Sequence, residues 1–150
     1  YMATNATPNL GLLDMSIDDI DDLPGFEVPV NGVYSLKFWT EVKVVNNKDC
    51  VELNFAVIEC LEQNDPSETA TKADTKFSML IQLGNEIAEG KMKAIILPVA
   101  AHFGERNMLK LITDTCSKAN GVIIIAKVKR RADKEDKDKF YADVSNVVVA

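Results

Sequence analysis

Residues that bind metals or form disulfides are scarce in this sequence. One histidine and three cysteines are scattered along the chain without the spacing of a metal-ligand set. Cys50 and Cys60 fall in one strand-like segment, about 33 Å apart if that strand is straight, which is too far for a disulfide. We therefore expect no metal and no cofactor, and free thiols that fill small apolar spaces in a reducing compartment.

Catalytic and membrane-spanning motifs are also missing. The sequence has no Gly-rich phosphate loop and no nucleophile elbow, so we expect that the chain is not an enzyme. Its longest apolar run, AIILPVAA, is interrupted by Pro98 and is far shorter than the roughly 18 residues that span a membrane. The chain does not open with the charged and then apolar pattern of a secretory signal. We expect a cytoplasmic protein without a membrane partner.

Acidic residues outnumber basic ones, but the excess is confined to one part of the chain. The 150 residues include 23 acids and 17 bases. Six of the acids and no base lie in residues 1–30, so residues 31–150 are neutral, with 17 of each. We predict an acidic, largely flexible leader at 1–27 and one folded domain at 28–150.

The leader contains the segment DMSIDDIDDLPGF, in which acids alternate with apolar residues. Two interpretations stay open: a solvated tail, or an acidic segment with apolar tips that docks on a basic surface. On the second interpretation, the partner-binding residues of the leader are Asp18, Asp19, Asp21, Asp22, Leu23 and Phe26.

Apolar residues alternate in five segments, which predicts five strands. The first two, 33–45 and 50–62, form a long hairpin, and a third strand covers 76–83. The last two, 122–131 and 140–149, form a closing hairpin around a charged loop.

Between the third and fourth strands the apolar period changes to three or four residues. This period predicts a helix from Gly90 to Gly104, kinked or divided at Pro98. A second helix would begin at Asn107 and end near Asn120–Gly121. The order β-β-β-α-α-β-β predicts a mainly β protein with a helical insert, a five-stranded OB-fold Greek-key barrel. Another small α+β sheet is the alternative.

The closing hairpin carries basic residues on one face. Side chains alternate between the two faces of a strand, so Lys127, Lys129 and Arg131 share a face. If the hairpin turns near Lys134–Glu135, Tyr141 lies opposite Lys129 on that face. This pattern indicates either a surface for an anionic ligand or a solvated face that protects a strand edge.

Trp39 is the lone aromatic residue on the polar face of its strand, and Lys37 and Lys43 flank it. We expect its ring on the solvent side, as a platform for stacking. The alternative is a core residue or a cover for a sheet edge. An aromatic platform beside basic residues is what non-specific binding of a nucleic-acid single strand requires.

Three segments of the chain resemble a known family. They are LPGFEVPVNGVYSLKFWTEVKVVNNKDCVELNFAVIECLE, FSMLIQLGNEIAEGKMKAIILPVAAHFG and GVIIIAKVKRRADKEDKDKFYADVSNV. In their strands, Gly-bracketed helix and hairpin they resemble phage-encoded OB-fold single-stranded DNA-binding proteins, over roughly residues 24–147. The resemblance implies a protein that coats single-stranded DNA during phage replication, recombination or repair, in the cytoplasm of an infected bacterium.

On this reading the aromatic rings stack on nucleobases and the basic side chains pair with phosphates. The expected DNA contacts are Lys37, Trp39, Lys43, Lys127, Lys129, Arg130, Arg131 and Tyr141. In related proteins an acidic tail usually follows the barrel, whereas here the acidic segment precedes it. The leader would compete with DNA for the basic groove and, once released, would bind replication or recombination proteins. The alternative function is a phage protein-interaction or structural β-barrel that binds no nucleic acid.

Overall fold

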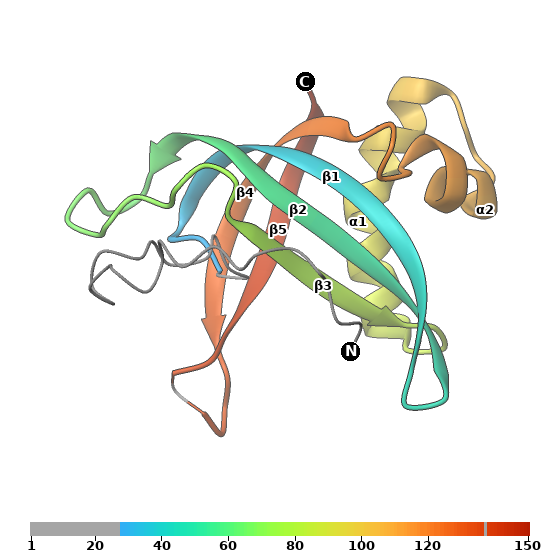
Figure 1. The fold of residues 1–150 in the computed structure, drawn as a ribbon, viewed down its shortest axis with the longest axis horizontal. Helices are drawn as coiled ribbons and strands as arrows, with labels where there is room; N and C mark the ends of the chain where they lie inside the picture. Colours follow the sequence, from blue (N-terminus) through green and yellow to red (C-terminus); the bar gives the residue numbers. More distant parts are fainter. Residues whose placement is uncertain (1–27, 137) are drawn as a thin grey trace, which may run out of the picture.

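Five strands form one antiparallel sheet in the order β3-β2-β1-β4-β5 (Figure 1). They are β1 (Gly32–Val45), β2 (Lys48–Gln63), β3 (Lys76–Gln82), β4 (Val122–Ala132) and β5 (Phe140–Val149). This computed structural model describes residues 28–136 and 138–150, so the predicted leader lies outside the described residues. The prediction of a mainly β protein with a helical insert is confirmed.

The main helix of the insert is α1 (Glu86–Phe103). It begins after Asn85, whose side chain accepts a backbone hydrogen bond from the first turn, and it ends at Gly104, whose φ is 69°. The predicted start at Gly90 is too late, because Asn85 supplies the N-terminal cap. The predicted division at Pro98 is not observed: α1 runs through this residue, since buried residues on both sides hold the helix against the sheet.

A short helical segment follows α1. Asn107 caps it as predicted, with its side chain accepting a hydrogen bond from the Lys110 N–H at 3.0 Å. The helix itself is much shorter than expected: α2 covers only Met108–Lys110, and a π-helical turn, η3, covers Leu111–Thr115.

Within the described ranges, no helix is both long enough and apolar enough to cross a membrane.

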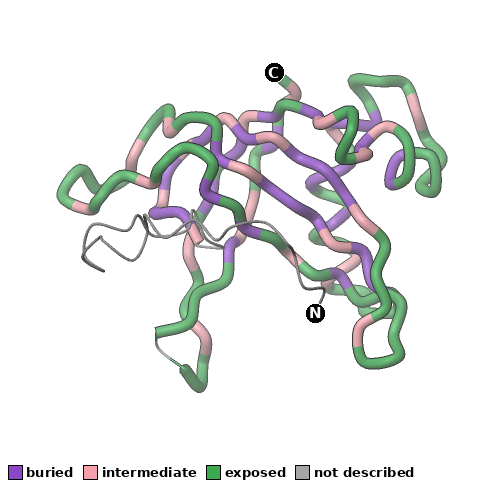
Figure 2. Tube along the Cα trace, viewed as in Figure 1, coloured by how far each residue is buried: buried purple, intermediate pink, exposed green. Residues whose placement is uncertain are grey.

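The core lies between the sheet and α1 (Figure 2). Three phenylalanine rings connect neighbouring strands: Phe55 stacks on Phe77 with 4.8 Å between ring centroids, and Phe38 lies 5.2 Å from Phe55. From α1, Met92, Ile95, Ile96, Val99 and Ala100 are buried. Because α1 packs against both β3 and β5, the two edge strands, the sheet curves around the helix (Figure 1).

Candidate nucleic-acid interface

Trp39 lies on the outer face of β1, away from the core cluster, as the alternation predicts. It is only 7% exposed, however, so the expectation of a ring open to solvent is wrong. Lys37 Nζ lies 5.6 Å from the ring centroid and Lys118 Nζ lies 6.0 Å from it. The indole N–H donates to Glu41 Oε1 at 3.3 Å. Lysine stems cover apolar surface while their charges stay near water, so Trp39 forms a covered platform.

A cavity of about 220 Å³ adjoins this ring. Its charged lining consists of Lys43, Lys76, Lys118, Glu41 and Glu52. Lys43 Nζ lies 2.8 Å from Glu52 Oε1, and this hydrogen bond raises the pKa of Lys43 above its usual value. Over the described ranges, Lys76 and Lys118 form no ion pair. An anion entering the cavity therefore meets two lysines whose charge no carboxylate neutralises directly.

Lys118 belongs to this site, although no pattern in the sequence identifies it. Lys118 follows η3, in a segment that is hydrogen-bonded to Thr40 of β1. The Thr40 N–H donates to the Cys116 carbonyl at 2.8 Å, and Thr40 Oγ1 donates to the Ile112 carbonyl at 2.7 Å. These hydrogen bonds bring Lys118 to Trp39. Because they join segments far apart in the chain, sequence periodicity could not reveal the contact.

Lys76 is a second residue of this site that was not among the expected DNA contacts. Its partner in the β2–β3 register is Ala56, and the partner of Ala56 on β1 is Lys37. The register therefore places Lys37 and Lys76 on one face, which an alignment of the predicted strands could have shown. The end of the Lys37 side chain passes beside Gly121, and a Cβ at this position would make the lysine shift.

The β4–β5 hairpin carries the other expected basic residues. Lys127, Lys129 and Arg131 are exposed on the outer face, so their predicted alternation is confirmed. Tyr141 shares this face, but it lies opposite Arg131 and not opposite Lys129. The hairpin turns later than predicted, because the Asp133 N–H donates to the Lys139 carbonyl at 2.9 Å and closes the loop there.

Tyr141 sits between two cations at the base of this loop. The Arg131 guanidinium lies 5.1 Å from its ring centroid, and Lys139 Nζ lies 5.4 Å from it. Its hydroxyl donates to Asp133 Oδ2 at 2.8 Å. Tyr141 is 38% exposed, so its ring is more open than that of Trp39.

Asp143 is a second acid on this surface, beside Asp133. It pairs with Arg131, whose Nε lies 3.3 Å from Oδ2, and with Lys91 of α1, whose Nζ lies 3.8 Å from Oδ1. In the part of the chain that the structure describes, Lys127 and Lys129 form no ion pair. These two lysines are thus the residues of the hairpin best placed to receive phosphates.

Arg130 points to the opposite face of β4. Its guanidinium donates to the Val28 carbonyl from Nη2 at 2.7 Å and to the Pro29 carbonyl from Nε at 3.0 Å. It also lies over the Phe140 ring, 5.2 Å from the centroid. Arg130, one of the expected DNA contacts, is thus turned away from the surface that carries Arg131, because side chains alternate between the two faces of a strand.

The two basic areas meet along β3. Lys76 of β3 lines the Trp39 cavity, whereas Ser78 and Leu80 line a cavity of about 460 Å³ that reaches Arg131 and Tyr141. In Figure 1 the β1–β2 and β4–β5 loops project to the same side of the molecule, with β3 between them. We interpret the two areas as the ends of one surface that crosses β3.

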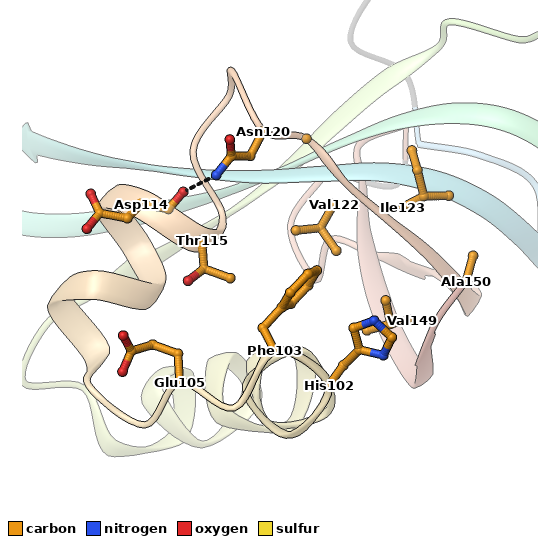
Figure 3. A pocket seen from close by; sticks show the side chains of 11 residues that line it. His102, Phe103, Glu105, Asp114, Thr115, Asn120, Val122, Ile123, Val149 and Ala150 are labelled. Atoms are coloured by element: carbon orange, nitrogen blue, oxygen red, sulfur yellow. Dashed lines mark hydrogen bonds between the residues drawn. The ribbon is translucent and has the colours of Figure 1, made fainter.

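A larger cavity, about 680 Å³, lies at the C-terminal end of α1 (Figure 3). Phe103 points across it towards Val122, and Glu105 and Asp114 are its charged residues. Because these groups are acids, the cavity does not suit a phosphate backbone. Among the described residues, no group of three or more His, Cys, Asp or Glu side chains could hold a metal ion.

The leader residues expected to bind a partner lie outside the described residues; they are Asp18, Asp19, Asp21, Asp22, Leu23 and Phe26.

No protein-family model matches the chain, and no curated protein matches it either.

Proposed function

We propose that this protein is an OB-fold protein that binds single-stranded DNA with little sequence preference. It would act in phage DNA replication, recombination or repair, in the cytoplasm of the infected bacterium. The observation that carries the proposal is the Trp39 ring with Lys37, Lys43, Lys76 and Lys118 gathered around it. An aromatic face for bases and nearby cations for phosphates are the two components of such a site.

The strand order supports the OB-fold part of the proposal. β1, β2 and β3 are consecutive antiparallel neighbours, and β4 returns after the helical insert to pair with the other edge of β1. That is the order of a Greek key. OB-folds bind oligonucleotides on the face of their second and third strands, between the loops after strands one and four. The Trp39 cavity and Lys76 lie on this face.

Binding has to uncover Trp39. An exposed cation–π contact is worth about 0.5–1 kcal/mol, and a charge-assisted hydrogen bond to phosphate is stronger. In the proposed complex, Lys37 and Lys118 leave the indole ring for phosphates. A nucleobase then takes their place and gains about 1–3 kcal/mol from stacking. The covered ring is thus compatible with a binding role, because the covering groups are the ones that a phosphate attracts.

The hairpin offers a second contact of the same kind. Tyr141 presents a half-open ring between Arg131 and Lys139, and Lys127 and Lys129 extend the row of cations along β4. A single strand of DNA with one base stacked on Trp39 would cross β3 and reach Tyr141 next. The domain is neutral overall, so this local gathering of cations, and not net charge, supports nucleic-acid binding.

A titration with oligo-dT and with duplex DNA of equal length, at two salt concentrations, tests the function. Trp39 is the single tryptophan, so its fluorescence reports on this site alone. We expect quenching by oligo-dT, weaker binding of duplex, and a steep loss of affinity with salt. Lys110→Gln, a change at an exposed lysine that lines neither cavity, should bind like the natural protein. Absence of binding at low salt contradicts the function, and binding without a fluorescence change contradicts the site.

One observation favours a second function, a phage protein-interaction or structural β-barrel without nucleic acid. Ile123 and Val148 are 38% and 59% exposed on the outer face of β4 and β5. Exposed apolar side chains of this kind are typical of surfaces that contact other proteins. In that case oligo-dT does not bind at any salt concentration.

A further inference from the structure

An apolar groove of about 330 Å³ lies between α1 and α2. Its floor consists of the buried side chains of Met92, Ile96 and Leu111. Its walls include Leu97 and Met108, which are 43% and 42% exposed. The groove has room for one or two large apolar side chains and is distinct from the Trp39 cavity.

The charged rim of this groove is mainly basic. Lys93 and Arg106 line it, and neither forms an ion pair within the described ranges. Glu89 also lines the groove, but its carboxylate accepts a hydrogen bond from the Gly84 N–H at 3.2 Å and is turned to the loop before α1. The groove therefore matches a segment in which apolar side chains are flanked by acids.

The chain itself contains such a segment. In DDIDDLPGF, the four aspartates Asp18, Asp19, Asp21 and Asp22 precede Leu23 and Phe26. No basic residue lies anywhere in residues 1–30. The apolar side chains of Leu23 and Phe26, beside four negative charges, therefore complement an apolar groove beside two positive charges.

The position of the leader's exit point decides which copy of the chain it can reach. Arg130 holds the Val28 and Pro29 carbonyls at the start of β1. In Figure 1, the start of β1 lies in the left half of the molecule, whereas α2 lies at the right end of the long axis. Five residues from Val28 to Leu23 span at most about 18 Å, whereas a compact domain of this size is roughly 35 Å across. Leu23 and Phe26 therefore fall short of the groove in their own copy.

We propose that the leader of one copy docks through Leu23 and Phe26 into the α1–α2 groove of a second copy. Because the leader leaves the side of the molecule opposite the groove, the contact is head-to-tail. Such a heterologous contact adds further copies, either in a ring, where the rotation between copies closes, or in an open chain, where it does not. The contact needs no DNA and is tested without it, which separates its failure from that of the proposed function.

Sedimentation velocity of the full chain over a range of protein concentrations measures this association. We expect concentration-dependent assemblies larger than a dimer, weakened at high salt. A leader variant, Leu23→Asp with Phe26→Asp, and a groove variant, Leu97→Asp, should each weaken association about tenfold or more. Ile87→Asp is the matched control: Ile87 is 77% exposed on α1 and lies outside the groove. Circular dichroism confirms that each variant is folded.

Mixing the leader variant with the groove variant identifies the head-to-tail arrangement. Each mixed pair keeps one intact leader and one intact groove, so the mixture should form dimers and no larger species. A monomer at all concentrations overturns the proposal, as does equal weakening by Ile87→Asp.

A photo-crosslinker in place of Leu97 in the full chain identifies the occupant. With a mixture of isotopically heavy and light chains, we expect adducts between residue 97 of one copy and residues 14–26 of another. Adducts within one copy, or adducts of the leader with the Trp39 face, overturn the proposal.

Discussion

The ammonium group of Lys118 lies 6.0 Å from the centroid of the Trp39 ring, although Trp39 belongs to β1 and Lys118 precedes β4. Thr40, the neighbour of Trp39, makes this contact possible because it hydrogen-bonds to the segment that carries Lys118. The environment of the candidate stacking residue thus depends on one threonine side chain and its backbone.

Replacing Thr40 with valine should loosen this arrangement. The buried Ile112 carbonyl loses its donor, which should lower the free energy of unfolding by about 1–3 kcal/mol. Lys118 should then cover Trp39 less well, so acrylamide should quench its fluorescence more strongly. Thr113→Val is the matched control, because the Thr113 hydroxyl makes a similar 2.7 Å hydrogen bond at an exposed position. Unchanged acrylamide quenching in folded Thr40→Val would show that Lys118 is held in another way.

Removing both lysines over the ring should open it and weaken DNA binding. In Lys37→Gln with Lys118→Gln, we expect stronger acrylamide quenching without DNA. We also expect a salt dependence of oligo-dT affinity that is shallower by roughly 0.7 in logarithmic slope for each lost phosphate contact. Lys110→Gln again serves as the control. An unchanged slope, with the ring opened, would mean that these lysines only shield Trp39.

Two replacements of Trp39 separate stacking from simple burial. Trp39→Phe keeps an aromatic face, whereas Trp39→Leu keeps apolar volume without one. Both should reduce stability, because Trp39 is only 7% exposed. Trp39→Leu should bind oligo-dT more weakly than Trp39→Phe, by about 1–3 kcal/mol for the lost stack. The measurement is fluorescence anisotropy of labelled oligo-dT, and equal affinities of the two variants argue against stacking at this position.

Neutralising the basic side chains on the outer face of β4 should weaken DNA binding and leave the fold intact. In the triple variant Lys127→Gln, Lys129→Gln and Arg131→Gln, oligo-dT affinity should depend less steeply on salt. Its logarithmic slope against salt concentration (the salt slope) should fall by roughly 0.7 for each lost phosphate contact. The melting temperature should stay nearly constant, because an exposed pair such as Arg131–Asp143 is worth only about 0–1 kcal/mol. A lower melting temperature with an unchanged slope would assign these residues to the fold.

Arg130→Gln should show the opposite behaviour. The Val28 and Pro29 carbonyls lose a charged donor, so the free energy of unfolding in urea should fall by about 1.5–3 kcal/mol. The salt slope of DNA binding should match that of the natural protein, because Arg130 faces away from the basic surface. If the slope falls as it does for the outer lysines, Arg130 contacts phosphate after all.

The faces of the strands could be predicted from the sequence, because side chains must alternate along an extended chain. Lys127, Lys129 and Arg131 therefore appeared on one face without any knowledge of the fold. The partner of Tyr141 could not be predicted in this way. It depends on where the hairpin loop closes, and the hydrogen bond from Asp133 to Lys139 moves the register so that Arg131, and not Lys129, lies opposite.

The sequence by itself determined the order of strands and helices along the chain and the face on which Trp39 lies, because these follow from local periodicity and from turn and cap residues. Only the tertiary structure decided that Trp39 is covered, that Lys118 joins it, and that Arg130 anchors the chain before β1. Those contacts join segments far apart in the chain. Their partners are set by the register of the sheet and by the docking of the segment after η3, neither of which leaves a periodic signal in the sequence.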